Sequence, residues 1–232
     1  RLSKTSDFGS GCSADGNIVI QASIYDAMIA ALVAEGGYLC SDEEAVSIEA
    51  AMWDERGNRT LATVACPPQQ IAAEAGFSIP EDRRFLMVPN HGKIGKEHRF
   101  SGEKLTTLMA LYRFEHFDEA LEMVRGIYAV AGKGHSCGIY SHRDDHIDAL
   151  ARVAPVSRMM VRQAQSKANA GSFNNGMPMT SSLGCGIWGG NITNENVTLK
   201  HMMNYTWVSR PIPEDRPSEQ ELFGTYFGRE VA

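Results

Sequence analysis

Short apolar segments alternate with segments of helical periodicity along most of the chain, and this alternation constrains the fold more than any other feature. Strands are predicted at residues 18–20, 85–88, 105–112, 136–140 and 159–161, and helices at residues 23–34, 42–53, 67–75, 117–131 and 144–153. Strands that are separated by helices need crossover connections and therefore pair mainly in parallel. We expect an α/β fold in which helices cover both faces of a mainly parallel open sheet.

The composition changes after Ala164, where glycine, asparagine, serine and methionine become frequent. Such a composition is typical of a long functional loop or an exposed tail. We expect one domain at residues 1–164. The remainder, residues 165–232, should contain a glycine-rich loop, a strand near residues 203–209 and a C-terminal tail. Because the chain starts at Arg1 without a methionine, we also expect it to be part of a longer protein.

Charge and residue usage exclude several classes of function. The formal net charge is -6 and the basic residues form no cluster, which argues against a nucleic-acid partner. No apolar run approaches the roughly 18 residues of a membrane-spanning helix, so we expect no membrane partner. The five cysteines and seven histidines show neither disulfide nor metal spacing, and no metal site is expected. Without a secretory signal, the sequence favours a cytoplasmic location.

Cys12 is the cysteine with the most suggestive surroundings. Glycines and small hydroxyl residues flank it on both sides, and such residues let a ligand approach the backbone closely. An exposed thiolate in a turn can act as a nucleophile. The alternative is an inert, buried cysteine, which is the commoner case. Cys185, in a glycine-rich segment, is the nearest rival.

His135 follows a Gly-Lys-Gly turn at a predicted junction between a helix and a strand. A tight turn there could direct the imidazole into a cleft. On its local context alone, a surface or hydrogen-bonded structural histidine is the better interpretation.

The segment at residues 184–189 matches the pattern GxGxxG. A dinucleotide-binding fingerprint follows a strand and opens a helix, with an acidic residue about 20 positions later. This segment instead leads into a predicted loop. We therefore expect no phosphate-binding turn here and no dinucleotide-binding fold within the chain.

Four segments resemble, in order, the second half of CoA-acylating aldehyde dehydrogenases. They are residues 3–12 (SKTSDFGSGC), residues 102–105 and 111–112 (GEKL and LY), residues 134–140 (GHSCGIY), and residues 183–191 with 195–197 and 200–201 (LGCGIWGGN, ENV and KH). Residues 210–224 are most similar to the sulfoacetaldehyde dehydrogenase branch. The family usually has phenylalanine where this chain has Ser6, and a Ser-Glu pair where it has Ala14 and Asp15.

The resemblance implies a covalent mechanism that uses NAD or NADP as the cofactor and CoA as co-substrate. The Cys12 thiolate would add to a small aldehyde, with sulfoacetaldehyde as the candidate. Hydride transfer would leave a thioester on Cys12, and CoA would then accept the acyl group. Within this scheme Glu103 would hold the nicotinamide-side ribose, and His135 would assist proton transfer during thiol exchange. The Cys12 backbone N–H is a candidate oxyanion donor.

The resemblance also implies that residues 1–164 are the catalytic domain and that the strand near residues 203–209 serves oligomerisation. A homo-oligomer, either a dimer or a tetramer, is expected. In the family the dinucleotide-binding domain precedes the reactive cysteine, so we expect it to be absent from this chain and the chain alone to be inactive.

Two other functions stay open at this point. A hydrolytic aldehyde dehydrogenase or a cysteine hydrolase would release a free acid. A non-catalytic domain kept for oligomerisation would need no reactive thiol. The length of the reading frame and the reaction product distinguish these possibilities.

Overall fold

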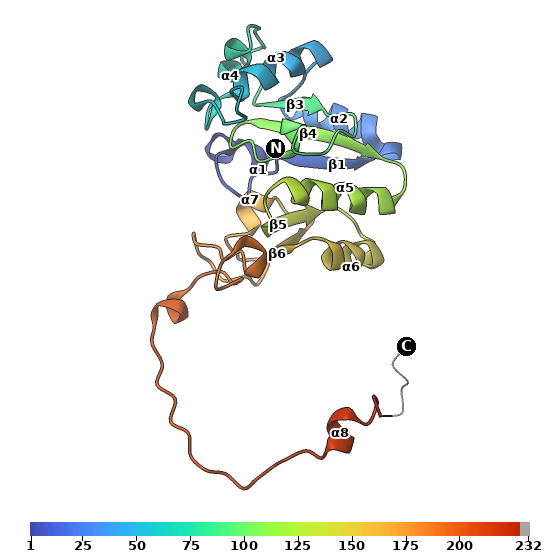
Figure 1. Cartoon of the computed structure of the whole chain (residues 1–232). Helices are drawn as coiled ribbons and strands as arrows, with labels where there is room; N and C mark the ends of the chain where they lie inside the picture. Colours follow the sequence, from blue (N-terminus) through green and yellow to red (C-terminus); the bar gives the residue numbers. More distant parts are fainter. Residues whose placement is uncertain (228–232) are drawn as a thin grey trace. The chain divides into compact units, whose positions relative to one another are not determined.

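The computed structural model describes residues 1–227, and every strand pair in this part of the chain is parallel (Figure 1). A four-stranded sheet has the order β1-β4-β3-β2, and β5 pairs with β6 in a separate sheet. The strands are β1 (Asn17–Gln21), β2 (Gly37–Leu39), β3 (Phe85–Pro89), β4 (Leu108–Phe114), β5 (Gly134–Ile139) and β6 (Val156–Val161). The predicted parallel pairing is confirmed, although it is divided between two sheets.

Helices connect these strands, as the alternation of the sequence predicts. They are α1 (Leu2–Thr5), α2 (Tyr25–Ala34), α3 (Asp42–Met52), α4 (Pro68–Glu74), α5 (Phe117–Val130), α6 (Asp144–Val153), α7 (Gln165–Ala168) and α8 (Glu219–Phe223). Helix α3 begins at a capping box, in which Ser41 and Glu44 each bond the other's backbone N–H. The helix predicted at residues 23–34 begins only at Tyr25, because the residues before it form a 3-10 turn (Ala22–Ile24).

The four-stranded sheet is buried on both faces. Alternate residues of β3 and β4, such as Leu86 and Leu108, pack in one apolar cluster with α3 and α4. The residues between them, such as Phe85 and Met109, pack against α2 on the opposite face. Helix α5 contributes to the first cluster and also to a third one that covers β5 and β6. Helices therefore cover both faces, as predicted, and strands buried in this way become continuously apolar.

Strand β2 was not predicted, because it is only three residues long and begins at Gly37, directly after Gly36, where two glycines in succession indicate the end of a helix. A Cβ atom at Gly37 would lie 2.8 Å from the Leu32 carbonyl oxygen and 2.9 Å from the Phe85 ring. Gly37 is thus needed for the close packing of α2 against the strand.

The chain divides into two compact units, Arg1–Thr198 and a C-terminal unit that starts at Leu199. The first unit continues beyond the expected boundary at residue 164. The predicted strand at residues 203–209 is not formed: these residues have no regular secondary structure in the described chain. Within the second unit the described part contains α8, and the last five residues of the expected tail, 228–232, lie outside the described residues.

Candidate active site

The three predicted site residues lie at the amino ends of parallel strands. Cys12 precedes β1, Glu103 precedes β4, and His135 is the second residue of β5. Strands β1 and β4 are parallel neighbours, so their amino ends lie on the same edge of the sheet. Topology therefore brings the segment of Cys12 and the segment of Glu103 to one side of the molecule.

Residues 6–16, here named the Cys12 loop, are held against this edge by an unusual backbone. Asp7 and Phe8 both have φ 49°, and Gly9 has φ 68°. A Cβ atom at Gly9 would lie only 2.5 Å from the Thr106 carbonyl oxygen. Glycine at position 9 therefore lets the Cys12 loop pack directly on the segment that follows Glu103.

Cys12 and His135 are in direct contact although 123 positions separate them in the sequence. The Cys12 Sγ atom lies 3.0 Å from His135 Nε2, and Cys12 is exposed. Burial lowers the pKa of His135, and the nearby Arg158 guanidinium lowers it further. The imidazole is therefore neutral at neutral pH and can accept a proton from the thiol.

Sequence reasoning missed the residues that surround His135. The His135 Nδ1 atom lies 2.8 Å from the Ser136 hydroxyl, to which the Asn169 side-chain amide donates at 3.1 Å. Arg158, only 5% exposed, donates hydrogen bonds to the carbonyl oxygens of His135, Gly184 and Asn194. An arginine in the middle of the short strand β6, directly before Met159, Met160 and Val161, was the one available signal in the sequence.

The structure does not bring Glu103 into contact with Cys12 or His135. Glu103 is exposed, and its carboxylate makes no hydrogen bond within residues 1–227. The adjacent Lys104 is buried, and its Nζ donates to Asn17 Oδ1 at 2.7 Å and to the Gly102 carbonyl oxygen at 2.9 Å. Lys104 thus fixes the backbone beside Glu103 and leaves the carboxylate available.

The other cysteines differ from Cys12 in burial. All five thiols are free, and burial raises the pKa of Cys40 and Cys137 to about 12 and also raises that of Cys66. Buried thiols of this kind are poor nucleophiles. Cys185 is half-buried and remains the rival that the sequence indicated.

The glycine-rich segment around Cys185 is a loop that packs on β5. A Cβ atom at Gly134 would lie 2.2 Å from the Cys185 carbonyl oxygen, so the loop contacts the residue next to His135. The segment at residues 184–189 opens only a three-residue 3-10 helix, Ile187–Gly189. It supports the backbone at His135 and does not have the strand-turn-helix form of a dinucleotide site.

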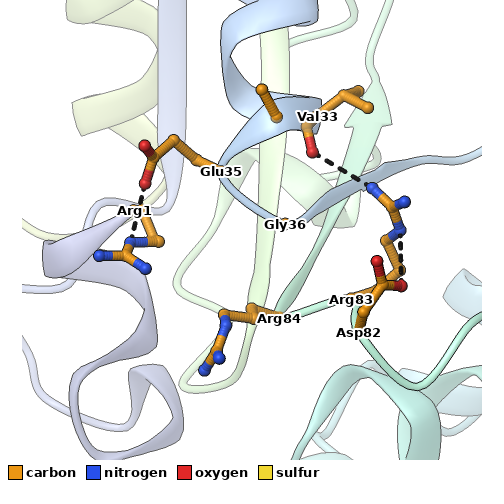
Figure 2. A pocket seen from close by; sticks show the side chains of 8 residues that line it. Arg1, Val33, Glu35, Gly36, Asp82, Arg83 and Arg84 are labelled. Carbon is orange, nitrogen blue, oxygen red and sulfur yellow. Dashed lines mark hydrogen bonds and ion pairs between the residues drawn. The ribbon is translucent and has the colours of Figure 1, made fainter.

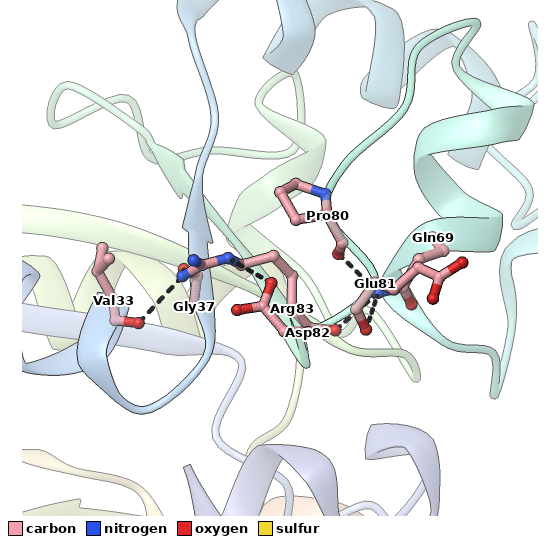
Figure 3. A network of polar contacts seen from close by, with 7 residues as sticks. All are labelled: Val33, Gly37, Gln69, Pro80, Glu81, Asp82 and Arg83. Atoms are coloured by element: carbon pink, nitrogen blue, oxygen red, sulfur yellow. Dashed lines mark hydrogen bonds and ion pairs between the residues drawn. The ribbon is translucent and has the colours of Figure 1, made fainter.

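A pocket of about 460 Å³ lies elsewhere, where α2 leads into β2 (Figure 2). Arg1 and Glu35 form an ion pair at 2.9 Å across it. Arg83 donates to the carbonyl oxygens of Val33 and Gly37, and the Gln69 amide donates to those of Pro80, Glu81 and Arg83 (Figure 3). These polar groups hold a turn together, and none of the predicted site residues lines the pocket.

The described residues contain neither a metal-binding cluster nor a membrane-spanning helix. Residues 1–227 contain no group of histidine, cysteine, aspartate or glutamate side chains placed to hold a metal ion. No helix in the same range is both long and apolar enough to cross a membrane.

The sequence matches no family model, but it is similar to individual proteins over nearly its whole length. A sulfoacetaldehyde dehydrogenase from Acholeplasma sp. is 39% identical over 99% of this chain and 48% of that protein. The acylating sulfoacetaldehyde dehydrogenase of Cupriavidus necator is 36% identical over 98% of this chain and 46% of that protein. The chain is homologous to the acylating aldehyde dehydrogenases.

A solved structure leads to the same family. The acetylating aldehyde dehydrogenase from Geobacillus thermoglucosidasius has a TM-score of 0.84 and 30% sequence identity, over 92% of this chain and 47% of that chain. The resemblance inferred from the four motifs and the expected α/β fold are confirmed. The chain spans about half the length of the curated relatives it matches.

Proposed function

We propose that this chain supplies the nucleophile and the base of a CoA-acylating aldehyde dehydrogenase. The observation that carries the proposal is the 3.0 Å contact between Cys12 Sγ and His135 Nε2 in a chain homologous to that family. A thiol beside a neutral imidazole is the arrangement by which enzymes activate a cysteine. The acylating type is favoured over the hydrolytic one because the relatives named for their chemistry are acylating.

The geometry supports the following roles. His135 Nε2 takes the proton of the Cys12 thiol, and the Sγ atom attacks the carbonyl carbon of the aldehyde. The Cys12 backbone N–H makes no hydrogen bond within residues 1–227, which supports its role as a donor to the developing oxyanion. After oxidation an acyl thioester remains on Cys12. His135 releases the proton it took from Cys12 to solvent and then accepts the proton of the CoA thiol. The CoA sulfur attacks the thioester carbonyl carbon, the acyl group passes to CoA, and the departing Cys12 thiolate takes the proton back from His135.

The nicotinamide cofactor, NAD or NADP, supplies the hydride acceptor when bound. Glu103 fits a role beside it, because its exposed carboxylate has two free oxygens that can accept hydrogen bonds from ribose hydroxyls. The hydrogen bonds of Lys104 fix the backbone on both sides of Glu103, so the position from which the Glu103 side chain extends is fixed as well.

Sulfoacetaldehyde is the proposed substrate, since two relatives carry that name. A positive charge next to the Cys12 loop favours an anionic substrate. The exposed Lys167 ammonium donates to the Ser6 hydroxyl at 3.2 Å, so a cation and a small side chain stand where the family usually has phenylalanine. A sulfonate is complementary to such a cation.

We further propose a homo-oligomer, dimeric or tetrameric, in the cytoplasm. Large apolar side chains are exposed in the C-terminal unit, among them Trp207, Val208 and Ile212. Contiguous apolar groups of this kind mark surfaces that bind another protein. Free thiols, including an exposed one, are typical of a reducing compartment.

The test is a steady-state assay of the full-length gene product with a panel of small aldehydes that includes sulfoacetaldehyde. We expect NAD(P)H formation that depends on CoA, with an acyl-CoA product, and a loss of at least about a thousandfold in Cys12→Ser. Cys185→Ser is the matched control and should retain activity. Free acid formed at an undiminished rate without CoA would assign the protein to the hydrolytic class. Turnover by Cys12→Ser would exclude the mechanism.

A further inference from the structure

Asn169 is a buried amide whose side-chain nitrogen contacts the residue next to His135, while its Oδ1 has no hydrogen-bond partner within the described residues. It follows α7, its relative exposure is 0%, and its Nδ2 donates to Ser136 Oγ at 3.1 Å and to the Gln165 carbonyl oxygen at 3.0 Å. Its own backbone carbonyl accepts from Asn196 Nδ2 at 3.0 Å. A fully buried asparagine is uncommon and needs such partners, so this side chain has little freedom to rotate.

A continuous series of hydrogen-bonding atoms connects this amide to the thiol. Asn169 contacts Ser136 Oγ, which lies 2.8 Å from His135 Nδ1, while His135 Nε2 lies 3.0 Å from Cys12 Sγ. The four residues come from three segments of the chain: the Cys12 loop, β5 and the end of α7. None of the contacts can be inferred from sequence spacing.

The same short helix also holds the Cys12 loop. The Gln165 side chain donates to Asp15 Oδ1 at 2.5 Å, and Ser3 Oγ accepts from the backbone N–H groups of Asp15 and Ser166 at 3.3 and 3.2 Å. Residues 165–169 therefore contact a neighbour of each member of the reactive pair: Asp15 in the loop that carries Cys12, and the Ser136 hydroxyl that contacts His135.

Proton transfer to His135 explains why these hydrogen bonds matter. His135 Nε2 can take the thiol proton only when the neutral ring carries its hydrogen on Nδ1, so Nδ1–H needs an acceptor both before and after the transfer. Ser136 Oγ is the acceptor in place, and the Asn169 amide donor keeps that oxygen from turning away. An unmet Nδ1–H in this half-buried position would disfavour the imidazolium.

We propose that Asn169 is a positioning residue of the reaction, which acts through the Ser136 hydroxyl to hold the His135 ring toward Cys12 and to keep an acceptor for Nδ1–H. The proposal rests on the proposed function for the role of His135. Asn169 itself contacts neither substrate nor thiol.

The groups that bear on the titration of His135 come from each neighbouring element. They are Cys12 in its loop, Arg158 on β6, Tyr128 of α5 bonded to the Ser136 carbonyl, Cys185 of the glycine-rich loop, and Asp15 and Lys167 near α7. Removing Asn169 or the Ser136 hydroxyl changes none of these charges. A shift in the pH profile would therefore report the hydrogen bonds themselves.

The experiment compares Asn169→Ala, Ser136→Ala and Ser136→Thr in the full-length gene product. Cys12 alkylation by iodoacetamide is followed between pH 5 and pH 9 by peptide mapping, and kcat and KM are measured in parallel. We expect both alanine variants to show a shifted pH profile and a fall in kcat of about tenfold with little change in KM for the aldehyde. Ser136→Thr keeps the hydroxyl and should restore both.

Asn175→Ala is the matched control, because Asn175 makes similar bonds to Gln163 and Ala168 without reaching Ser136. It should leave the profile unchanged. If Asn169→Ala does not fold, the Ser136 pair decides alone. An unchanged pH profile and kcat in folded Asn169→Ala, or in folded Ser136→Ala, would overturn the proposal. Alkylation is read without turnover, so failure of the proposed function, seen as an active Cys12→Ser, is a separate result.

Discussion

Lys4 and Lys104 place two ammonium groups in the interior close to the Cys12 loop. Their relative exposures are 2% and 1%, and neither is hydrogen-bonded to a carboxylate within residues 1–227. Burial lowers the pKa of Lys4 to about 8, although Asp15 and Glu103 oppose the shift, and burial lowers the pKa of Lys104 well below its usual value. A buried charge of this kind reduces the stability of the fold.

Replacing Lys4 by methionine should therefore stabilise the chain at neutral pH. The folded-state pKa of about 8 lies below the model-peptide value of 10.5, so the unfolded chain binds more protons between these pH values. The destabilising contribution of Lys4 is complete below pH 8 and disappears as the pH rises to 10.5. We expect Lys4→Met to raise the free energy of unfolding by roughly 3 kcal/mol at pH 7, with a smaller gain above pH 8.

Urea unfolding at a series of pH values measures this gain, and Lys96→Met serves as the control because Lys96 is exposed. A gain independent of pH, or a loss of stability at pH 7, would show that the Lys4 ammonium is better accommodated than its burial indicates.

Among the individual residues of the site, Cys12 and His135 were predicted from their motifs, but the residues around them were not. Ser136, Asn169 and Arg158 act through hydrogen bonds between distant segments. Only folding creates such contacts, and apart from the charged Arg158 within a short strand, the local sequence does not indicate them. Glu103 was found by its motif as well, but its role depends on a cofactor and remains a prediction.

Among the elements, the Cys12 loop depends most on a single backbone position. Gly9 has φ +68°, and a Cβ atom there would lie 2.5 Å from the Thr106 carbonyl oxygen. Because both atoms in that contact belong to the main chain, the loop itself would have to move. Gly11, by contrast, has no atom within 4 Å of its hypothetical Cβ.

Gly9→Ala should accordingly lower the free energy of unfolding by about 1–3 kcal/mol and slow the alkylation of Cys12. Gly11→Ala is the matched control and should have a much smaller effect on stability. Thermal unfolding and timed iodoacetamide labelling give the two readouts. Equal behaviour of the two variants would mean that the loop is not fixed by its contact with Thr106.

Elements with strong periodicity were predicted well, and weak ones were not. Helix α6 was predicted with the observed bounds, Asp144–Val153, because its apolar face is well defined. The three-residue strand β2 and the four-residue helices α1 and α7 are too short to leave a periodic signal. The strand expected at residues 203–209 has the composition of a strand, but these residues pair with no other strand in the described chain.

The two units of the molecule differ in how they bury their apolar side chains. Residues 1–198 enclose apolar clusters on both faces of a parallel sheet, so this unit has a core of its own. The described part of the second unit keeps its large apolar side chains exposed. A surface of that kind favours association with another copy of the chain.

The chain of 232 residues should therefore fold and self-associate but should not oxidise aldehydes alone. Folding is expected from the closed core of the first unit. Inactivity is expected because the relatives are about twice as long, and hydride transfer needs the cofactor held beside Cys12. Positioning of that sort can contribute about 7–11 kcal/mol to lowering the barrier. Calorimetric titration with NAD and NADP, turnover assays and light scattering on the chain, with the full-length gene product as the control, would decide the matter. Micromolar cofactor binding with normal turnover would instead mean that residues 1–232 hold a complete active site.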